Sequence, residues 1–321
     1  MNLLYKQIPD AKSELEYLFK EYVNVCRYSK RLSEKTISGY TEVFSTFSKI
    51  MFEIKDKDDL HAQMMPEFFR RISTRIRIVG KDTRISGVKA STIRTYHNKL
   101  VIFFKWLENN GHLTVSITEH MIVPPVPMYE DERALTDSQV AKIISSITLY
   151  GMEDAFIYAR DIAIVSLLLY TGVRKGELLA LRIGDIDFGS SSLFINGVTS
   201  KSKKSRYIPL HFSVVTHLMG YLKEREKRNT KCEYLLVSSK ADTALTEHGL
   251  KFWVNKYIGL SGVKFHLHRF RHTFACKLAK KNADIISIMN VMGHSTTRMT
   301  ERYLRSIKAE NSRSYIDKLT F

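Results

Sequence analysis

Apolar residues in the first 120 residues recur every three to four positions, which is the period of α-helices that pack through one face. One such face runs from Leu15 to Val23, and a second follows Ser33 and continues to Met51. A third helix is predicted around Met65 to Ile72. The last runs from Ser91 to Asn109, where Asn110-Gly111 is typical of a helix end. The first part of the chain is therefore predicted to be helical.

The spacing of apolar residues changes in the second part. Thr136-Asp137-Ser138-Gln139 is a capping box that predicts a helix start. Asp161 is expected to cap the next helix, whose run Ile162–Tyr170 is apolar on all sides and predicts burial. Alternating stretches at 185–188, 193–197 and 206–210 predict short strands, and helices return after Glu247. The predicted fold class is mainly α with a small antiparallel β-sheet.

A proline-rich segment separates the two parts. Residues 123–127 hold three of the six prolines of the chain, followed by an acidic stretch. Proline cannot continue a helix and holds the chain extended. We therefore predict a helical domain over residues 1–122, a linker over 123–132 and a second domain over 133–321.

The charge balance narrows the class of partner. Fifty Lys and Arg against 33 Asp and Glu give a net charge of +17, which favours a polyanion such as double-stranded DNA. A membrane partner is not expected, because no apolar run approaches the roughly 20 residues of a spanning helix, and no signal peptide is recognised. The three cysteines lie far apart, which suits a reducing compartment. We expect a cytoplasmic, nucleoid-associated protein.

A run of basic residues follows the third predicted helix. It contains Arg70, Arg71, Arg75 and Arg77, with Lys81 and Arg84 shortly after. A solvated loop would explain such a run. In a chain of this net charge we instead expect contact with DNA phosphates.

The first two of four motifs in the second part carry an arginine and several lysines. Arg174 stands at a predicted helix start, and Glu177 follows on the same face, where it can hold the guanidinium. A predicted hairpin over residues 197–206 carries four cations, among them Lys201, Lys203 and Lys204. Charges also gather on exposed hairpin tips for no functional reason, so each motif alone is weak.

The other two motifs carry histidines and a tyrosine. Three histidines lie within residues 266–272, but no nearby cysteine or carboxylate completes a zinc site, and His268 and Arg271 can instead face one cleft. His294 follows Gly293 at a predicted helix end, and Tyr303 lies nine residues further on. A single tyrosine is more often a packing or surface residue.

In order, Arg, Lys, His-x-x-Arg, Gly-His and Tyr form a combination that resembles the tyrosine recombinase (phage-integrase-type) family over essentially all of 133–321. The family shares its catalytic fold with type IB topoisomerases, and residues 1–122 look like its core-binding domain. The resemblance implies one catalytic set: Tyr303 as nucleophile, Arg174 and Arg271 as phosphate clamps, Lys201 and His268 as proton-transfer groups, and His294 as second-row histidine. Counting back from 206–210 selects Lys201 over Lys203 and Lys204, which we expect to contact DNA.

These residue types suit attack on a phosphodiester. Two arginines can stabilise the charge that develops on the phosphate oxygens, so neither a metal nor a cofactor is expected. The resemblance implies a site-specific recombinase or integrase of a mobile element, working through a 3′-phosphotyrosyl intermediate and a Holliday junction. Four protomers would assemble on paired DNA sites, with accessory DNA-bending proteins as further candidate partners. A type IB topoisomerase-like relaxing enzyme and a non-catalytic DNA-binding regulator are the alternatives.

Overall fold

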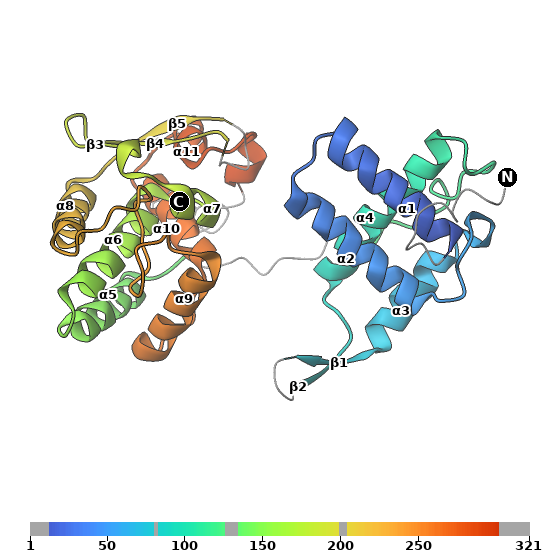
Figure 1. The fold of residues 1–321 in the computed structure, drawn as a ribbon, viewed down its shortest axis with the longest axis horizontal. Helices are drawn as coiled ribbons and strands as arrows, with labels where there is room; N and C mark the ends of the chain where they lie inside the picture. Colours follow the sequence, from blue (N-terminus) through green and yellow to red (C-terminus); the bar gives the residue numbers. More distant parts are fainter. Residues whose placement is uncertain (1–12, 80–82, 126–133, 199–203, 302–321) are drawn as a thin grey trace, which may run out of the picture. The chain divides into compact units, whose positions relative to one another are not determined.

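The chain folds into two units, Met1–Tyr129 and Glu130–Phe321. The computed structural model describes residues 13–79, 83–125, 134–198 and 204–301. Helices dominate both units, and the sheets among these residues are small and antiparallel (Figure 1), which confirms the predicted fold class. No helix within the described ranges is long and apolar enough to cross a bilayer.

Helices α1 (Glu14–Asn24), α2 (Glu34–Ile50), α3 (Met64–Thr74) and α4 (Ala90–Asn109) form the first unit. A π-helical turn, Val25–Ser29, extends α1, and a short 3₁₀ turn, Lys57–Asp59, precedes α3. The core between the helices is aromatic: Phe19 stacks on Phe44 with ring centroids 3.8 Å apart, and both make T-shaped contacts with Phe103. The helices predicted from apolar spacing are therefore present, and Ser33 caps α2 as expected.

The run of basic residues after the third predicted helix, which a solvated loop would have explained, includes a β-hairpin. α3 continues to Thr74, and β1 (Ile76–Val79) then pairs with β2 (Thr83–Ser86). Ile76 lies opposite Ser86, and Ile78 lies opposite Arg84. Both isoleucines are exposed, which explains why apolar spacing did not predict these strands.

The second unit is built around a central helix. α6 (Ala155–Thr171) packs against α5 (Asp137–Gly151), α8 (Phe212–Lys227) and α10 (Leu267–Lys280), while α9 (Glu247–Ser261) packs on α5. The short helices α7 (Lys175–Ala180) and α11 (Ile285–Met292) complete it. Thr136 and Gln139 form the predicted capping box of α5. The all-round apolar character of α6 is explained by burial of nearly its whole length.

A three-stranded antiparallel sheet covers one end of this unit. A 3₁₀ turn, Ile183–Asp185, leads into β3 (Ile186–Asp187), which pairs with β4 (Ser192–Ile195), and β4 pairs with β5 (Arg206–Pro209). These strands match the three predicted stretches. The register places Arg206, the first residue of β5, opposite Ile195, and β5 contacts α11. The β4–β5 pairing thus brings Arg206 to the carboxyl end of α11.

The prediction that Asp161 caps a helix is wrong. α6 begins at Ala155, seven residues before Ile162, because Asp154 accepts hydrogen bonds from the backbone N–H groups of the first turn at 2.9 and 3.0 Å. Asp161 lies inside α6 and is fully buried. Its carboxylate accepts hydrogen bonds from Arg160 Nε at 2.9 Å and from the Tyr257 hydroxyl at 2.7 Å. The Asp161 carboxylate therefore joins α6 to α9 inside the core.

Candidate active site

Three arginines converge on the carboxyl end of α11. The helix ends at Gly293, whose φ of 63° lies in the left-handed region. The last carbonyls of a helix have no partner inside it and need one elsewhere. Here the carbonyls of residues 291–293 accept hydrogen bonds, in that order, from Arg206 Nε at 2.9 Å, Arg271 Nη2 at 2.5 Å and Arg174 Nη2 at 2.8 Å. Cations also interact favourably with the partial negative charge of a helix C-terminus.

Glu177 joins two of these arginines. Its carboxylate accepts from Arg174 Nη1 at 2.9 Å, which is the contact predicted from their spacing, and from Arg206 Nη1 and Nη2 at 3.1 and 2.8 Å. Glu177 is only 1% exposed. Burial by itself would raise the pKa of Glu177, but the hydrogen bonds from Arg206 and from the Arg174 backbone, with the charges of both arginines, lower it to about 2. Glu177 is therefore an ionised anchor for both guanidinium groups.

His294 acts as a neutral acceptor for Arg271. The Arg271 side chain is buried, donates to the carbonyl of Gly172 at the end of α6, and lies 2.9 Å from His294 Nε2 through Nη2. Because arginine can only donate, Nε2 accepts, so the ring proton is on Nδ1, which lies 2.8 Å from Thr300 Oγ1. Burial, then the charges of Arg271 and Arg174, lower the pKa of His294 from 6.5 to about 3. The imidazole is therefore uncharged near neutral pH.

His268 occupies the first turn of α10, one turn before Arg271, and its side chain is exposed. When it is protonated, His268 adds to the charges that lower the pKa of His294. The structure thus brings Arg174, Arg271 and His294 together at one helix end. Lys201 and Tyr303, the other two predicted catalytic residues, lie outside the described residues, as does Lys203.

The predicted DNA-contact residues of the first unit differ in their surroundings. Arg70 forms two hydrogen bonds with Glu67 at 2.7 Å, and Arg71 is held by Glu67 and Glu53. Arg77 donates to a backbone carbonyl at 2.7 Å. Arg75 is exposed at the start of the hairpin, and in the second unit Lys204 is exposed. The two arginines of α3 are therefore already paired with carboxylates.

The histidines near the start of α10 do not form a metal centre. His266 is exposed, whereas His272 is buried and its Nε2 lies 3.5 Å from Cys276 Sγ, one turn along the helix. Within the described ranges, no group of three His, Cys, Asp or Glu side chains is arranged to hold a metal ion.

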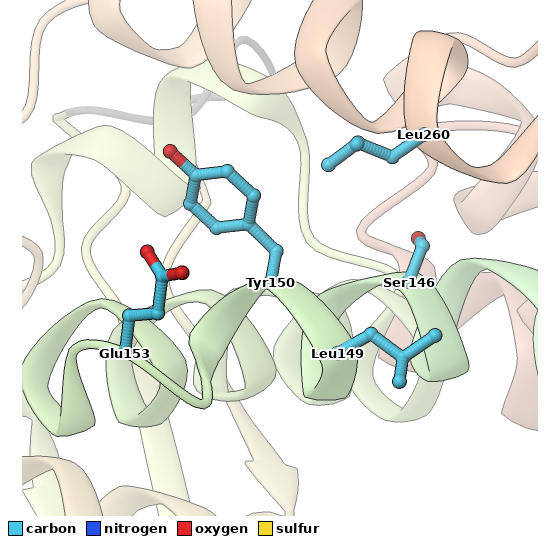
Figure 2. Close-up of a pocket in the computed structure, with 5 residues that line it drawn as sticks. All are labelled: Ser146, Leu149, Tyr150, Glu153 and Leu260. Carbon is cyan, nitrogen blue, oxygen red and sulfur yellow. The ribbon is translucent and has the colours of Figure 1, made fainter.

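A shallow cavity of about 350 Å³ lies between α5 and α9. Figure 2 shows Tyr150 on α5, Glu153 in the turn just after this helix, and Leu260 across from them. The Lys256 ammonium lies 3.4 Å from the centroid of the Tyr150 ring. The residues that line this cavity include none of those predicted for the active site.

Comparison with known proteins identifies the family. Residues 133–310, more than half of the chain, match the sequence model of the phage integrase family. The chain belongs to this family. The tyrosine recombinase XerC of Bacillus pumilus (strain SAFR-032) is 27% identical over 314 residues, which cover 95% of this chain and 96% of the relative. Membership of the phage integrase family confirms the resemblance drawn from the motifs.

Two solved structures of recombinases show the same fold. The XerH site-specific recombinase bound to its palindromic difH substrate, a post-cleavage complex, has a TM-score of 0.72 at 20% identity, covering 98% of this chain and 87% of that one. The lambda integrase tetramer bound to a Holliday junction has a TM-score of 0.68 at 16% identity, covering 94% of this chain and 80% of that one. The likeness extends over both units of this phage integrase family member.

Sequence reasoning missed two residues of the site. Arg206 was noted only as the end of the basic hairpin, and Thr300 was not singled out. The sequence did place Arg206 as the first residue of a predicted strand, and a side chain in a strand must point to one of the two faces of the sheet. Nothing in the local sequence marks Thr300, whose partner His294 lies six residues away.

Proposed function

We propose that this protein is a site-specific DNA recombinase that cuts and rejoins strands through a 3′-phosphotyrosyl intermediate. The observation that carries the proposal is the meeting of Arg174, Arg271 and a neutral His294 at one helix end, in a member of the phage integrase family. The naming of its relative from Bacillus pumilus as a tyrosine recombinase supports the same activity.

The proposed reaction exchanges one phosphodiester for another. The Tyr303 oxygen attacks phosphorus as its proton passes to His268, and a new P–O bond forms. The bond to the 5′ oxygen breaks, and that oxygen leaves with the bonding electron pair and takes a proton from Lys201. Rejoining reverses these steps with the 5′ hydroxyl of a partner strand. Because the bond energy stays in the phosphotyrosine, no cofactor is consumed.

The proposed role of Arg174 and Arg271 is to bind the non-bridging oxygens, where negative charge grows as phosphorus becomes five-coordinate. Guanidinium groups suit this role, because they stay charged and donate in a fixed fork. The proposed role of His294 is to position Arg271. A charged imidazole at 2.9 Å would repel that guanidinium, whereas the neutral ring accepts from it.

The proposed substrate is double-stranded DNA, bound by four protomers on paired sites with a Holliday junction between the two exchanges. The lambda integrase tetramer on a Holliday junction offers a precedent for such an assembly. In the first unit we assign DNA contact to the β1–β2 hairpin, where Arg75 and Arg84 are exposed, because a two-stranded ribbon fits the major groove. Arg70 and Arg71 would first have to leave their carboxylates. Accessory DNA-bending proteins and action at the nucleoid belong to the same proposal.

Covalent trapping tests this function. A binding site is first selected from random-sequence DNA by repeated capture on the protein, and is then nicked so that the cut strand loses a short fragment and cannot be rejoined. We expect the wild-type protein to form a denaturant-resistant protein–DNA adduct and Tyr303→Phe to form none, with Tyr315→Phe as the matched control. Binding without any adduct from the wild-type protein would support the regulator alternative instead.

A further inference from the structure

Arg206 stands between the three elements that carry the site. It begins β5, its Nε donates to the carbonyl of Val291 at 2.9 Å, and both of its terminal nitrogens donate to Glu177 on α7. No other described arginine joins this strand to both helices. Arg206 therefore fixes the end of the β4–β5 hairpin against the residues that hold Arg174.

Burial separates the role of Arg206 from that of Arg174. The Arg206 side chain is 9% exposed, against 21% for Arg174. All three nitrogens of the Arg206 guanidinium donate to protein acceptors. With every guanidinium nitrogen donating to the protein, Arg206 is committed to its present partners, and the more exposed Arg174 is the member of this pair that can meet a phosphate.

The positive charge of Arg206 balances the negative charge of Glu177. Glu177 is the described carboxylate in contact with the arginine cluster, and a buried carboxylate draws the nearest cation toward itself. The three guanidinium groups and Glu177 together leave two positive charges at this helix end. Without Arg206, the whole charge of Glu177 would act on Arg174, and one positive charge would remain.

We infer that Arg206 is a positioning residue, which neutralises Glu177 and thereby leaves the charge and direction of Arg174 available to the scissile phosphate. This inference rests on the proposed function. It assigns Arg206 no contact with DNA, so its loss should slow cleavage of bound DNA without weakening binding to a similar degree.

The test is a charge-restoring pair of variants. Arg206→Gln leaves Arg174 as the only described arginine in contact with Glu177. The double variant Glu177→Gln, Arg206→Gln returns the cluster to two positive charges, while the amide oxygen that replaces the carboxylate can still accept from Arg174. Cleavage of the nicked duplex is measured in a single turnover at saturating DNA, beside the DNA dissociation constant and the melting temperature. Arg182→Gln is the control, because Arg182 pairs with Glu233 at 2.8 Å on the exposed surface of the same unit.

We expect Arg206→Gln to slow cleavage by about 10²-fold, as misplacement of a catalytic group by about 1 Å can do. The double variant should recover at least about tenfold of that loss, since removing both members of a buried pair costs far less than removing one. A role in folding alone would lower the melting temperature and leave the cleavage rate of bound protein unchanged. If Arg206→Gln cleaves as fast as the wild-type protein, or if the double variant cleaves as slowly as Arg206→Gln, this inference is wrong while the proposed function stands. Absence of any adduct from the wild-type protein would overturn the proposed function as well.

Discussion

Replacing Gly293 by alanine should displace the arginine cluster through a single methyl group. A Cβ on Gly293 would lie 2.6 Å from Arg206 Nη1 and 2.8 Å from its Cζ, well inside van der Waals contact. The guanidinium cannot move aside freely, because Glu177 and the carbonyl of Val291 hold it. The left-handed backbone adds about 1–2 kcal/mol of strain for any residue with a Cβ. Breaking a buried ion pair costs about 3–5 kcal/mol, so we expect Gly293→Ala to destabilise the protein by at least about 3 kcal/mol.

Gly262 provides the matched control. It ends α9 with a φ of +67°, and a Cβ there would meet nothing within 4 Å. Gly262→Ala should therefore show the backbone strain alone, a fall in melting temperature of about 2–8 °C for a unit of this size. Thermal melting and single-turnover cleavage are measured for both variants. We expect Gly262→Ala to cleave at the wild-type rate and Gly293→Ala to cleave about 10²-fold more slowly. Equal cleavage rates for the two variants would refute the steric reasoning.

Three further predictions follow from the site and the tail. Arg271→Lys keeps the charge but cannot hold Met292, Gly172 and His294 at once, so single-turnover cleavage should fall about 10²–10³-fold while the DNA dissociation constant changes far less. The pKa of His294 in the folded state, about 3, lies below its ordinary value of 6.5, so the unfolded state binds more protons between these two pH values. The free energy of unfolding should therefore fall as the pH drops below about 6.5. In urea denaturation at a series of pH values, His294→Gln should make this fall smaller. Residues 305–321 include the apolar residues Ile307, Tyr315, Ile316, Leu319 and Phe321, and we expect this tail to dock on a neighbouring protomer rather than on its own catalytic domain. Truncation after Leu304 should therefore retain single-site binding in gel shifts and lose synapsis, whereas recombination at the wild-type rate would refute docking on a neighbour.

Helix ends were predictable where a side chain caps its own helix. Ser33 and Thr136 each accept a hydrogen bond from a backbone N–H three residues ahead, so the signal is local. The same reasoning failed at Asp161, because a buried carboxylate with partners on α9 looks like a capping residue in sequence. Only the observed hydrogen bonds of Asp154 separate the two.

The site was predictable as a set of residue types but not as an arrangement. Arg174 and Glu177 lie three residues apart, so their contact follows from helix geometry. Arg206 follows several lysines in the sequence, and its place at the start of a predicted strand does not show which residues it contacts. Its partners lie 29 and 85 residues away and are brought near only by the β4–β5 pairing and the packing of α11. Contacts of that kind depend on the tertiary fold.

The most direct test of the central claim is to identify the amino acid that becomes joined to DNA. The wild-type adduct is digested with protease and nuclease, and the nucleotide-linked peptide is sequenced by mass spectrometry. We predict a single modified peptide in which Tyr303 carries the 3′-phosphate of the cleaved strand. A phosphate linked to Tyr315 or to any other residue, or a link through the 5′ end, would contradict it.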